Sequence, residues 1–231
     1  MLFFYSGDVP ELDQLLLDAL GPEHDLLIIP YSPHEMWAAK DSFDYFDEAG
    51  LRPRFLSRSE YLNPAKLRAA VMAADAVFLT GGNTYEFLAY ARQVQLFELL
   101  THFEAKGGII ASESAGSILL SPDVSTAGLP HTFADDNILQ LTDLTAMGRV
   151  AYHFHPHHEP DSKLFDEEMA QLQQLADESK IPVLMLQDGQ GLVMQGDGEI
   201  VHAIGAYEIL LPQTAIEPVL LIDGQALIPD V

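Results

Sequence analysis

Short apolar runs alternate with helical stretches over the first half of the chain, and this alternation constrains the fold more than any other feature. The apolar runs are 2–5, 26–30, 75–80 and 108–111, with a weaker one at 53–56. The stretches between them carry apolar residues at helical spacing, over 11–20, 34–49, 65–74, 84–92 and 95–106. This pattern is typical of parallel βαβ units, whose strands are apolar throughout because helices cover both faces of the sheet.

The last third of the chain has a different pattern. Its apolar runs are shorter and are separated by Gly, Asp or Pro, at 181–186, 191–195, 200–203, 207–210 and 219–222. We expect these runs to be strands that complete the sheet, some of them antiparallel. No linker-like segment interrupts the chain, so we predict one α/β domain over residues 1–231.

The charge balance excludes several kinds of partner. The chain has 35 acidic and 11 basic residues, a formal net charge of -24. No basic stripe could neutralise phosphates, so we expect no nucleic-acid binding, and an anionic membrane surface would repel the chain. The acidic residues can simply be a solvated surface that favours solubility, or their field can favour a cationic substrate or a free α-amino group.

Cysteine is absent from the sequence. A thiol nucleophile and disulfides are therefore impossible, which is consistent with a reducing compartment, and we expect a cytoplasmic protein. The first apolar run has no positive residues before it and is predicted to be a strand rather than a signal peptide. No apolar stretch approaches the roughly 18 residues of a membrane span.

A strand-to-helix turn at Ser114 is the first candidate for chemistry. The apolar run at 108–111 leads into Ser112-Glu113-Ser114-Ala115-Gly116, and a helix is predicted just after Ser114. A nucleophile elbow needs this layout, with small residues around a strained turn that exposes the hydroxyl and directs the next backbone N–H, that of Ala115, at an oxyanion. The alternative is that Ser114 only caps a helix.

A glycine pair supplies a candidate second oxyanion donor. Gly81-Gly82-Asn83-Thr84 follows one apolar run and precedes a helical stretch. Glycine lets the backbone approach a ligand closely, although an ordinary glycine turn would look the same. The residues that a phosphate-binding loop or a dinucleotide-binding motif would require are missing.

Histidines cluster at 153–158, where four of the chain's nine lie. One interpretation is a metal site, since His and Glu are zinc ligands, but Pro156 interrupts the strand that would put alternate histidines on one face, and the sequence has no His-Glu-x-x-His motif. The other is that one imidazole is the general base for Ser114. Such a base needs an orienting acid, and Asp188 follows an apolar run, although an Asp-Gly turn is the simpler explanation for that residue alone.

These segments together resemble the dipeptidase E family of serine peptidases, which also includes cyanophycinases. The resemblance rests on the loop at 78–84, on Ser114-Ala115-Gly116 after a buried run, on Phe154-His155-Pro156-His157, and on Asp188-Gly189. Motif order and spacing extend it over about residues 1–210.

The resemblance implies a flavodoxin-like three-layer sandwich related to class I glutamine amidotransferases, with a mostly parallel central sheet and helices on both faces. It implies that Ser114 attacks a peptide carbonyl, that His157 is the base and that Asp188 orients it. Gly82 and Ala115 would form the oxyanion hole. The expected substrate is a short peptide, no cofactor or metal is expected, and the protein would act as a monomer or homodimer.

The segments that hold the substrate in this family are not all matched. Residues 162–168 have no Arg where the family's aspartyl dipeptidases hold an acidic side chain, and Lys163 is not a bidentate clamp, so we expect no preference for Asp before the scissile bond. The candidates for substrate contacts are Asn83, Glu113 and Asp135, with an exposed turn carboxylate as the alternative for Glu113. A binder that kept the fold and lost activity is the alternative function.

Overall fold

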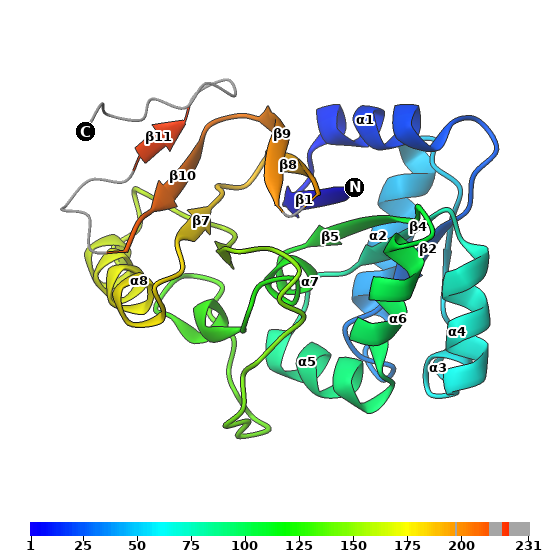
Figure 1. The fold of residues 1–231 in the computed structure, drawn as a ribbon, viewed down its shortest axis with the longest axis horizontal. Coiled ribbons are helices and arrows are strands. Elements are labelled where there is room, and N and C mark those ends of the chain that lie inside the picture. Colours follow the sequence, from blue (N-terminus) through cyan, green and yellow to red (C-terminus); the bar gives the residue numbers. More distant parts are fainter. Residues whose placement is uncertain (197, 213–218, 222–231) are drawn as a thin grey trace.

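The computed structural model describes residues 1–196, 198–212 and 219–221. Its centre is a seven-stranded sheet in the order β3-β2-β4-β5-β1-β8-β9 (Figure 1). The strands are β1 (Leu2–Ser6), β2 (Leu26–Ile29), β3 (Pro53–Phe55), β4 (Ala76–Leu79), β5 (Ile109–Glu113), β8 (Gln190–Gln195) and β9 (Glu199–Ile204). The first five pair in parallel, and β8 and β9 extend the sheet in antiparallel register.

The parallel part of the sheet has a flavodoxin-like arrangement. Flavodoxin-like sheets have the spatial order 2-1-3-4-5. The order β3-β2-β4-β5-β1 is the same arrangement with the last position filled by the first strand of the chain. The predicted fold class, a mostly parallel α/β sandwich, is therefore confirmed.

Alternate residues of each strand enter two separate cores. Phe3, Ile28 and Phe78 belong to the core on one face, and Phe4, Leu27 and Leu79 to the core on the other. The helices α1 (Pro10–Leu20) and α2 (Trp37–Glu48) cover the first face. The second face is covered by α4 (Pro64–Ala73), α5 (Thr84–Gln93), α6 (Leu96–Glu104) and the short α7 (Ala115–Ile118). This two-sided burial explains why the strands are apolar at every position.

The helix ends follow the local sequence. Pro64 occupies the first turn of α4, and the side chain of Asn63 accepts hydrogen bonds from the backbone N–H groups of Ala65 and Lys66. α1 likewise begins at a proline, and it ends at Gly21, whose φ of 76° suits glycine. A one-turn helix, α3 (Arg58–Tyr61), precedes α4.

A second sheet was not predicted. It has the order β11-β10-β7-β6, from β6 (His153–His155), β7 (Val183–Met185), β10 (Tyr207–Leu210) and β11 (Val219–Leu221). The expectation that all late strands complete one sheet is right for β8 and β9 and wrong for β7, β10 and β11. Residue 222 of the last predicted strand lies outside the described residues.

The second sheet packs against the core that contains α5 to α7, through Phe154, Leu184 and Tyr207. Its other face is covered by α8 (Phe165–Ser179), which buries Leu172 and Ala176 against Val183 and Met185. None of the helices within the described residues is both long and apolar enough to cross a membrane.

Candidate active site

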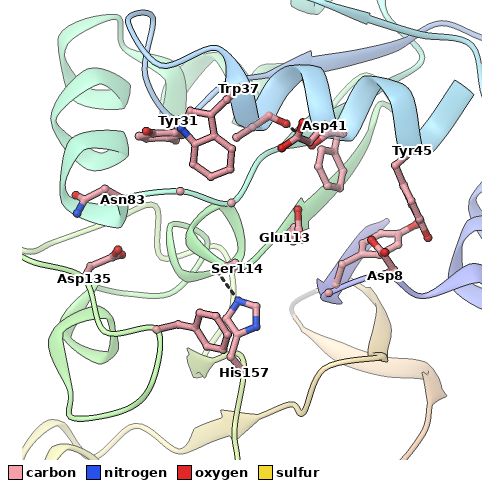
Figure 2. A pocket seen from close by; sticks show the side chains of 18 of the residues that line it. Asp8, Tyr31, Trp37, Asp41, Tyr45, Asn83, Glu113, Ser114, Asp135 and His157 are labelled. Carbon is pink, nitrogen blue, oxygen red and sulfur yellow. Dashed lines mark hydrogen bonds between the residues drawn. The ribbon is translucent and has the colours of Figure 1, made fainter.

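The site lies where the parallel strands end. The loops after β1, β2, β4 and β5 meet the α2 helix around a cavity of about 640 Å³, which also borders the loop at 133–135 and His157 (Figure 2). Ligands of open α/β sheets bind outside the carboxyl ends of the strands. Four of the residues predicted from these loops, Gly82, Asn83, Glu113 and Ser114, therefore border one cavity.

Ser114 joins β5 to α7 in a strained backbone conformation, with φ 48° and ψ -115°. Positive φ is uncommon for a residue with a side chain and marks a constrained position. Its side chain makes no capping hydrogen bond to α7, so the helix-cap interpretation is wrong. Gly116 makes the turn possible, because a Cβ there would lie 2.3 Å from the carbonyl oxygen of Leu79.

The predicted nucleophile, base and acid form a hydrogen-bonded line. His157 Nε2 lies 2.9 Å from Ser114 Oγ, and His157 Nδ1 lies 2.5 Å from Asp188 Oδ1. The hydrogen bond from His157 lowers the pKa of Asp188, which keeps the carboxylate ionised. The imidazole is mostly buried, with 14% of its side chain exposed, whereas Asp188 is 58% exposed.

A fourth residue, Ser6, connects the two loops that carry His157 and Asp188. It is fully buried at the end of β1. Its Oγ accepts a 3.0 Å hydrogen bond from the backbone N–H of His157 and donates to the carbonyl oxygen of Leu186 at 3.3 Å. Asp188 Oδ1 is 3.5 Å away, at the limit of a hydrogen bond. Because His157 also has a positive φ, of 57°, this contact stabilises a constrained backbone.

The glycine loop packs directly on Ser114. A Cβ at Gly81 would lie 3.4 Å from the Cβ of Ser114, and one at Gly82 would lie 2.2 Å from the ring of Tyr31. Gly82 also has a φ of 128°, which favours glycine. Within the part of the chain that the structure describes, the backbone N–H groups of Gly82 and Ala115 donate no hydrogen bond. Both are therefore available to a ligand beside Ser114.

Two carboxylates predicted to contact substrate border the cavity. Burial raises the pKa of Glu113, and the charges of Asp8 and Asp188 add to this effect while His157 opposes it. Burial also raises the pKa of Asp135, whose Oδ2 accepts a 2.8 Å hydrogen bond from the backbone N–H of Thr84.

Asn83 also borders the cavity. Its Oδ1 accepts from the backbone N–H of Glu86 and caps α5, and its Nδ2 donates to the carbonyl oxygen of Asp136. Its amide is thus used to hold the loop in place.

Two of the remaining histidines of the cluster, His155 and His158, bind a buried glutamate. His155 Nε2 and His158 Nδ1 lie 2.9 and 2.8 Å from Glu168 Oε1, and all three side chains are almost completely buried. Among the described residues these are the three side chains whose donor atoms come close enough together to hold a metal ion. The second ring nitrogens of both histidines are buried without a partner, whereas metal-bound histidines almost always donate from that nitrogen. The geometry is that of a hydrogen-bonded network beneath His157.

Several residues at the site were missed in the sequence. Ser6 is the last residue of β1 and Asp8 follows it closely. The rule that ligands bind at the carboxyl ends of the strands, which selected Ser114 and Gly82, could have identified both. Asp41 comes from α2, and Phe133 lies against the imidazole of His157 with ring centroids 4.7 Å apart. These last two carry no local signal, because a helix and an irregular loop bring them to the cavity from a distance.

Comparisons with known proteins agree on one family. The family model for peptidase family S51 matches residues 3–201. A Shewanella amazonensis protein named peptidase E is 26% identical over 202 residues, which cover 83% of this chain and 81% of that protein. A Streptomyces coelicolor protein of the same name is 28% identical over 128 residues, 54% of this chain and only 50% of that protein.

Two solved structures have the same fold. One is a protein provisionally named peptidase E from Listeria monocytogenes EGD-e, with a TM-score of 0.68 and 18% identity, covering 88% of this chain and 96% of that one. The other is a peptidase from an acI-B1 Actinobacterium, with a TM-score of 0.69 and 16% identity, covering 98% and 95% of the two chains.

Proposed function

Because this chain belongs to peptidase family S51, a family of serine-type peptidases, we propose that it hydrolyses short peptides with Ser114, His157 and Asp188 as its catalytic triad. One observation carries the proposal. The hydroxyl, the imidazole and the carboxylate lie within hydrogen-bond distance in that order, at 2.9 and 2.5 Å. A nucleophile, a base and an orienting acid need this arrangement.

The proposed reaction starts when Ser114 Oγ attacks the peptide carbonyl. His157 Nε2 takes the hydroxyl proton, and Asp188 stabilises the imidazolium through Nδ1. The tetrahedral oxyanion accepts hydrogen bonds from the free N–H groups of Gly82 and Ala115. Collapse of this intermediate breaks the C–N bond as His157 protonates the leaving amine, and water then hydrolyses the acyl-enzyme by the same steps in reverse order. No cofactor takes part in this proposed sequence.

The walls of the cavity favour a substrate without an acidic side chain. Asp8, Asp41, Glu113 and Asp135 border it, and its lining within the described residues contains no Lys or Arg. We therefore propose that the enzyme does not prefer Asp before the scissile bond. Asp135 lies on the Asn83 side of Ser114, opposite Asp8 and Tyr45 (Figure 2), and it is our candidate for holding the free α-amino group of the peptide.

An inactive binder is disfavoured by the same geometry. In a protein that had lost catalysis, selection would no longer keep a base at hydrogen-bond distance from a strained serine. A location in the cytoplasm and action as a monomer or homodimer remain predictions from the sequence.

The test is to treat wild type and Ser114→Ala with a fluorophosphonate and to assay both on a library of dipeptides and tripeptides. Loss of a triad nucleophile lowers kcat by about 10⁴-fold or more, so labelling and turnover should both disappear. Ser112→Ala is the matched control, since Ser112 lies on the same strand, is fully buried and bonds to Phe3 and Ser117 instead of the triad. Turnover that survives in Ser114→Ala would refute the mechanism.

A further inference from the structure

We propose that the part of the cavity lined by Asp8, Asp41 and Glu113 receives the side chain of a Lys or Arg residue whose carbonyl Ser114 attacks, with Glu113 as the counter-ion. This inference rests on the proposed peptidase function and adds the substrate class. It concerns an ordinary α-linked peptide with the cationic residue on the acyl side of the scissile bond.

The first argument is charge. Three carboxylates from three elements, the β1 loop, α2 and the end of β5, border this part of the cavity. None of them forms an ion pair with a Lys or Arg side chain within the described residues. The wider chain adds a field of the same sign, with a net charge of -24. Carboxylates that border one part of a cavity favour a cationic ligand there over a neutral or anionic one.

Glu113 is the carboxylate that we assign as the partner of the cation. Its pKa is raised by burial and by the charges of Asp8 and Asp188, so its ionised form is held at a cost. A cation placed against Glu113 removes part of that cost and gains a charge-assisted hydrogen bond. Glu113 directly precedes Ser114, so its carboxylate borders the same cavity as the nucleophile proposed above.

The second argument is the shape and chemistry of the walls. Tyr5, Tyr45, Phe46 and Phe78 line the cavity and pack edge to face with one another, with ring centroids 4.7–6.1 Å apart. Aromatic walls accept the methylene stem of Lys or Arg and attract its charged end. A volume of about 640 Å³ lies within the range of small-ligand pockets, so a long side chain can enter.

The position of the carboxylates favours a side chain over the α-ammonium group. Figure 2 shows Glu113 pointing from the Ser114 end of β5 toward Asp41 on α2, with Asp8 on a third wall. An α-ammonium group is held close to the attacked carbonyl by its short connection. A Lys or Arg side chain has the length to extend along Glu113 toward Asp41, and Asp135 on the other side of Ser114 remains for the α-amino group.

The experiment compares matched dipeptides that differ only in charge. Lys-Ala is compared with norleucine-Ala, and Arg-Ala with citrulline-Ala, on wild type, Glu113→Gln and Glu98→Gln. Glu98 is exposed on α6 and does not line the cavity, so its variant removes one charge without touching the site. Wild type should prefer Lys over norleucine in kcat/KM by at least about 10-fold, as expected for a hydrogen bond between charged groups. This preference should fall to about 1 in Glu113→Gln and persist in Glu98→Gln.

Other outcomes separate the two proposals. Equal hydrolysis of Lys and norleucine peptides would overturn the cationic pocket and leave the peptidase standing. Failure of every peptide together with no labelling of Ser114 would overturn the function itself. One further result would assign Glu113 to the α-amino group and overturn the inference. In that result, wild type hydrolyses free Lys-Ala and norleucine-Ala at equal rates but does not hydrolyse N-acetyl-Lys-Ala. Glu113→Gln then slows the hydrolysis of both free dipeptides by the same factor.

Folding of the variant is checked by thermal unfolding. If Glu113→Gln is unstable, Asp41→Asn provides the second variant, because Asp41 is exposed on a helix surface. The same ratio of rates is then measured, and a preference for Lys that does not fall in Asp41→Asn would overturn the placement of the cationic side chain between Glu113 and Asp41.

Discussion

Replacing Ser6 with alanine tests whether one buried hydroxyl holds the catalytic base in place. The hydroxyl receives the backbone N–H of His157 at 3.0 Å and donates to Leu186 at 3.3 Å, and the Asp188 carboxylate is 3.5 Å away. It therefore ties β1 to both loops. In Ser6→Ala the methyl group fills the space but leaves the N–H of His157 without its acceptor.

Ser6→Ala should lower both the free energy of unfolding and kcat. An unsatisfied, mostly buried N–H group costs about 1–3 kcal/mol of folding free energy. His157 has a φ of 57°, a conformation that costs on the order of 1 kcal/mol and needs support, so its loop should relax when the bond is lost. A shift of about 1 Å in a catalytic group can cost on the order of 100-fold in rate. We expect kcat to fall by about 10- to 100-fold.

The assay separates kcat from KM and uses a matched control. Ser6 does not line the cavity, so KM should change little while kcat falls. Ser121→Ala is the control, because Ser121 is also fully buried and its Oγ also accepts a backbone N–H, that of Phe154, at 2.9 Å. Both variants should lose a similar amount of unfolding free energy in urea, but Ser121→Ala should keep its kcat.

An equal kcat for the two variants would refute the reasoning. It would mean that the Ser6 hydroxyl contributes to stability alone and that the loops carrying His157 and Asp188 are held by other contacts. A loss confined to KM would refute it in another way, by assigning Ser6 to the substrate site.

Gly116, Glu168 and Asp188 give three further predictions. Gly116→Ala should lower the melting temperature by roughly 5–10 °C in a thermal scan, since its Cβ would lie 2.3 Å from the carbonyl oxygen of Leu79 and overpacking costs about 1–3 kcal/mol. Burial alone would raise the pKa of Glu168, but the hydrogen bonds from two histidines outweigh it and lower this pKa to about 2. The ionised form of Glu168 therefore stabilises the fold above pH 4.5. That contribution to stability is lost as the pH falls toward about 2. Urea titrations should show the stability advantage of wild type over Glu168→Gln shrinking by about 3 kcal/mol across that window, and a constant difference would contradict the assignment. Asp188→Asn should lower kcat by about 100-fold or more, less than the roughly 10⁴-fold known for a buried triad acid because this carboxylate is 58% exposed, and an unchanged rate would show that another group orients His157.

The strands and helices of the central sheet could be predicted because their signals are local. Each apolar run at 2–5, 26–30 and 75–80 overlaps an observed strand, and the helical spacing between the runs identified α1, α2, α4, α5 and α6. The helix predicted after Ser114 is only one turn long. Pro122 follows soon after and cannot continue a helix, which explains why the helix is short.

The second sheet could not be predicted because pairing is not local. The runs at 181–186 and 207–210 show that strands form, but nothing in them specifies which neighbour they bond to. The α8 helix was missed for another reason. Its buried face is narrow, with Leu172 and Ala176 among few apolar residues in an acidic stretch, so its helical spacing is weak.

Some residues of the candidate site could likewise be identified from local signals, and others could not. Ser114, Gly82 and Asp188 each follow a predicted strand, so a rule about strand ends was enough to select them. Ser6 follows a predicted strand too, but its role depends on contacts 151 and 180 residues away along the chain, which no local pattern contains. The carboxylate pocket depends on the packing of α2 over the sheet and could be recognised only in three dimensions.

The central place of β1 has a consequence for how the molecule forms. β1 bonds to β5 on one side and to β8 on the other, so the earliest strand to be synthesised must wait for partners from the middle and the end of the chain. Contacts of such large sequence separation form slowly, and unpaired strand edges are prone to aggregate in the meantime. On a ribosome the β2–β4 region can pair first, and the proposed nucleophile, base and acid come together only after β8 has emerged. An incomplete chain would therefore carry a serine turn but no working peptidase.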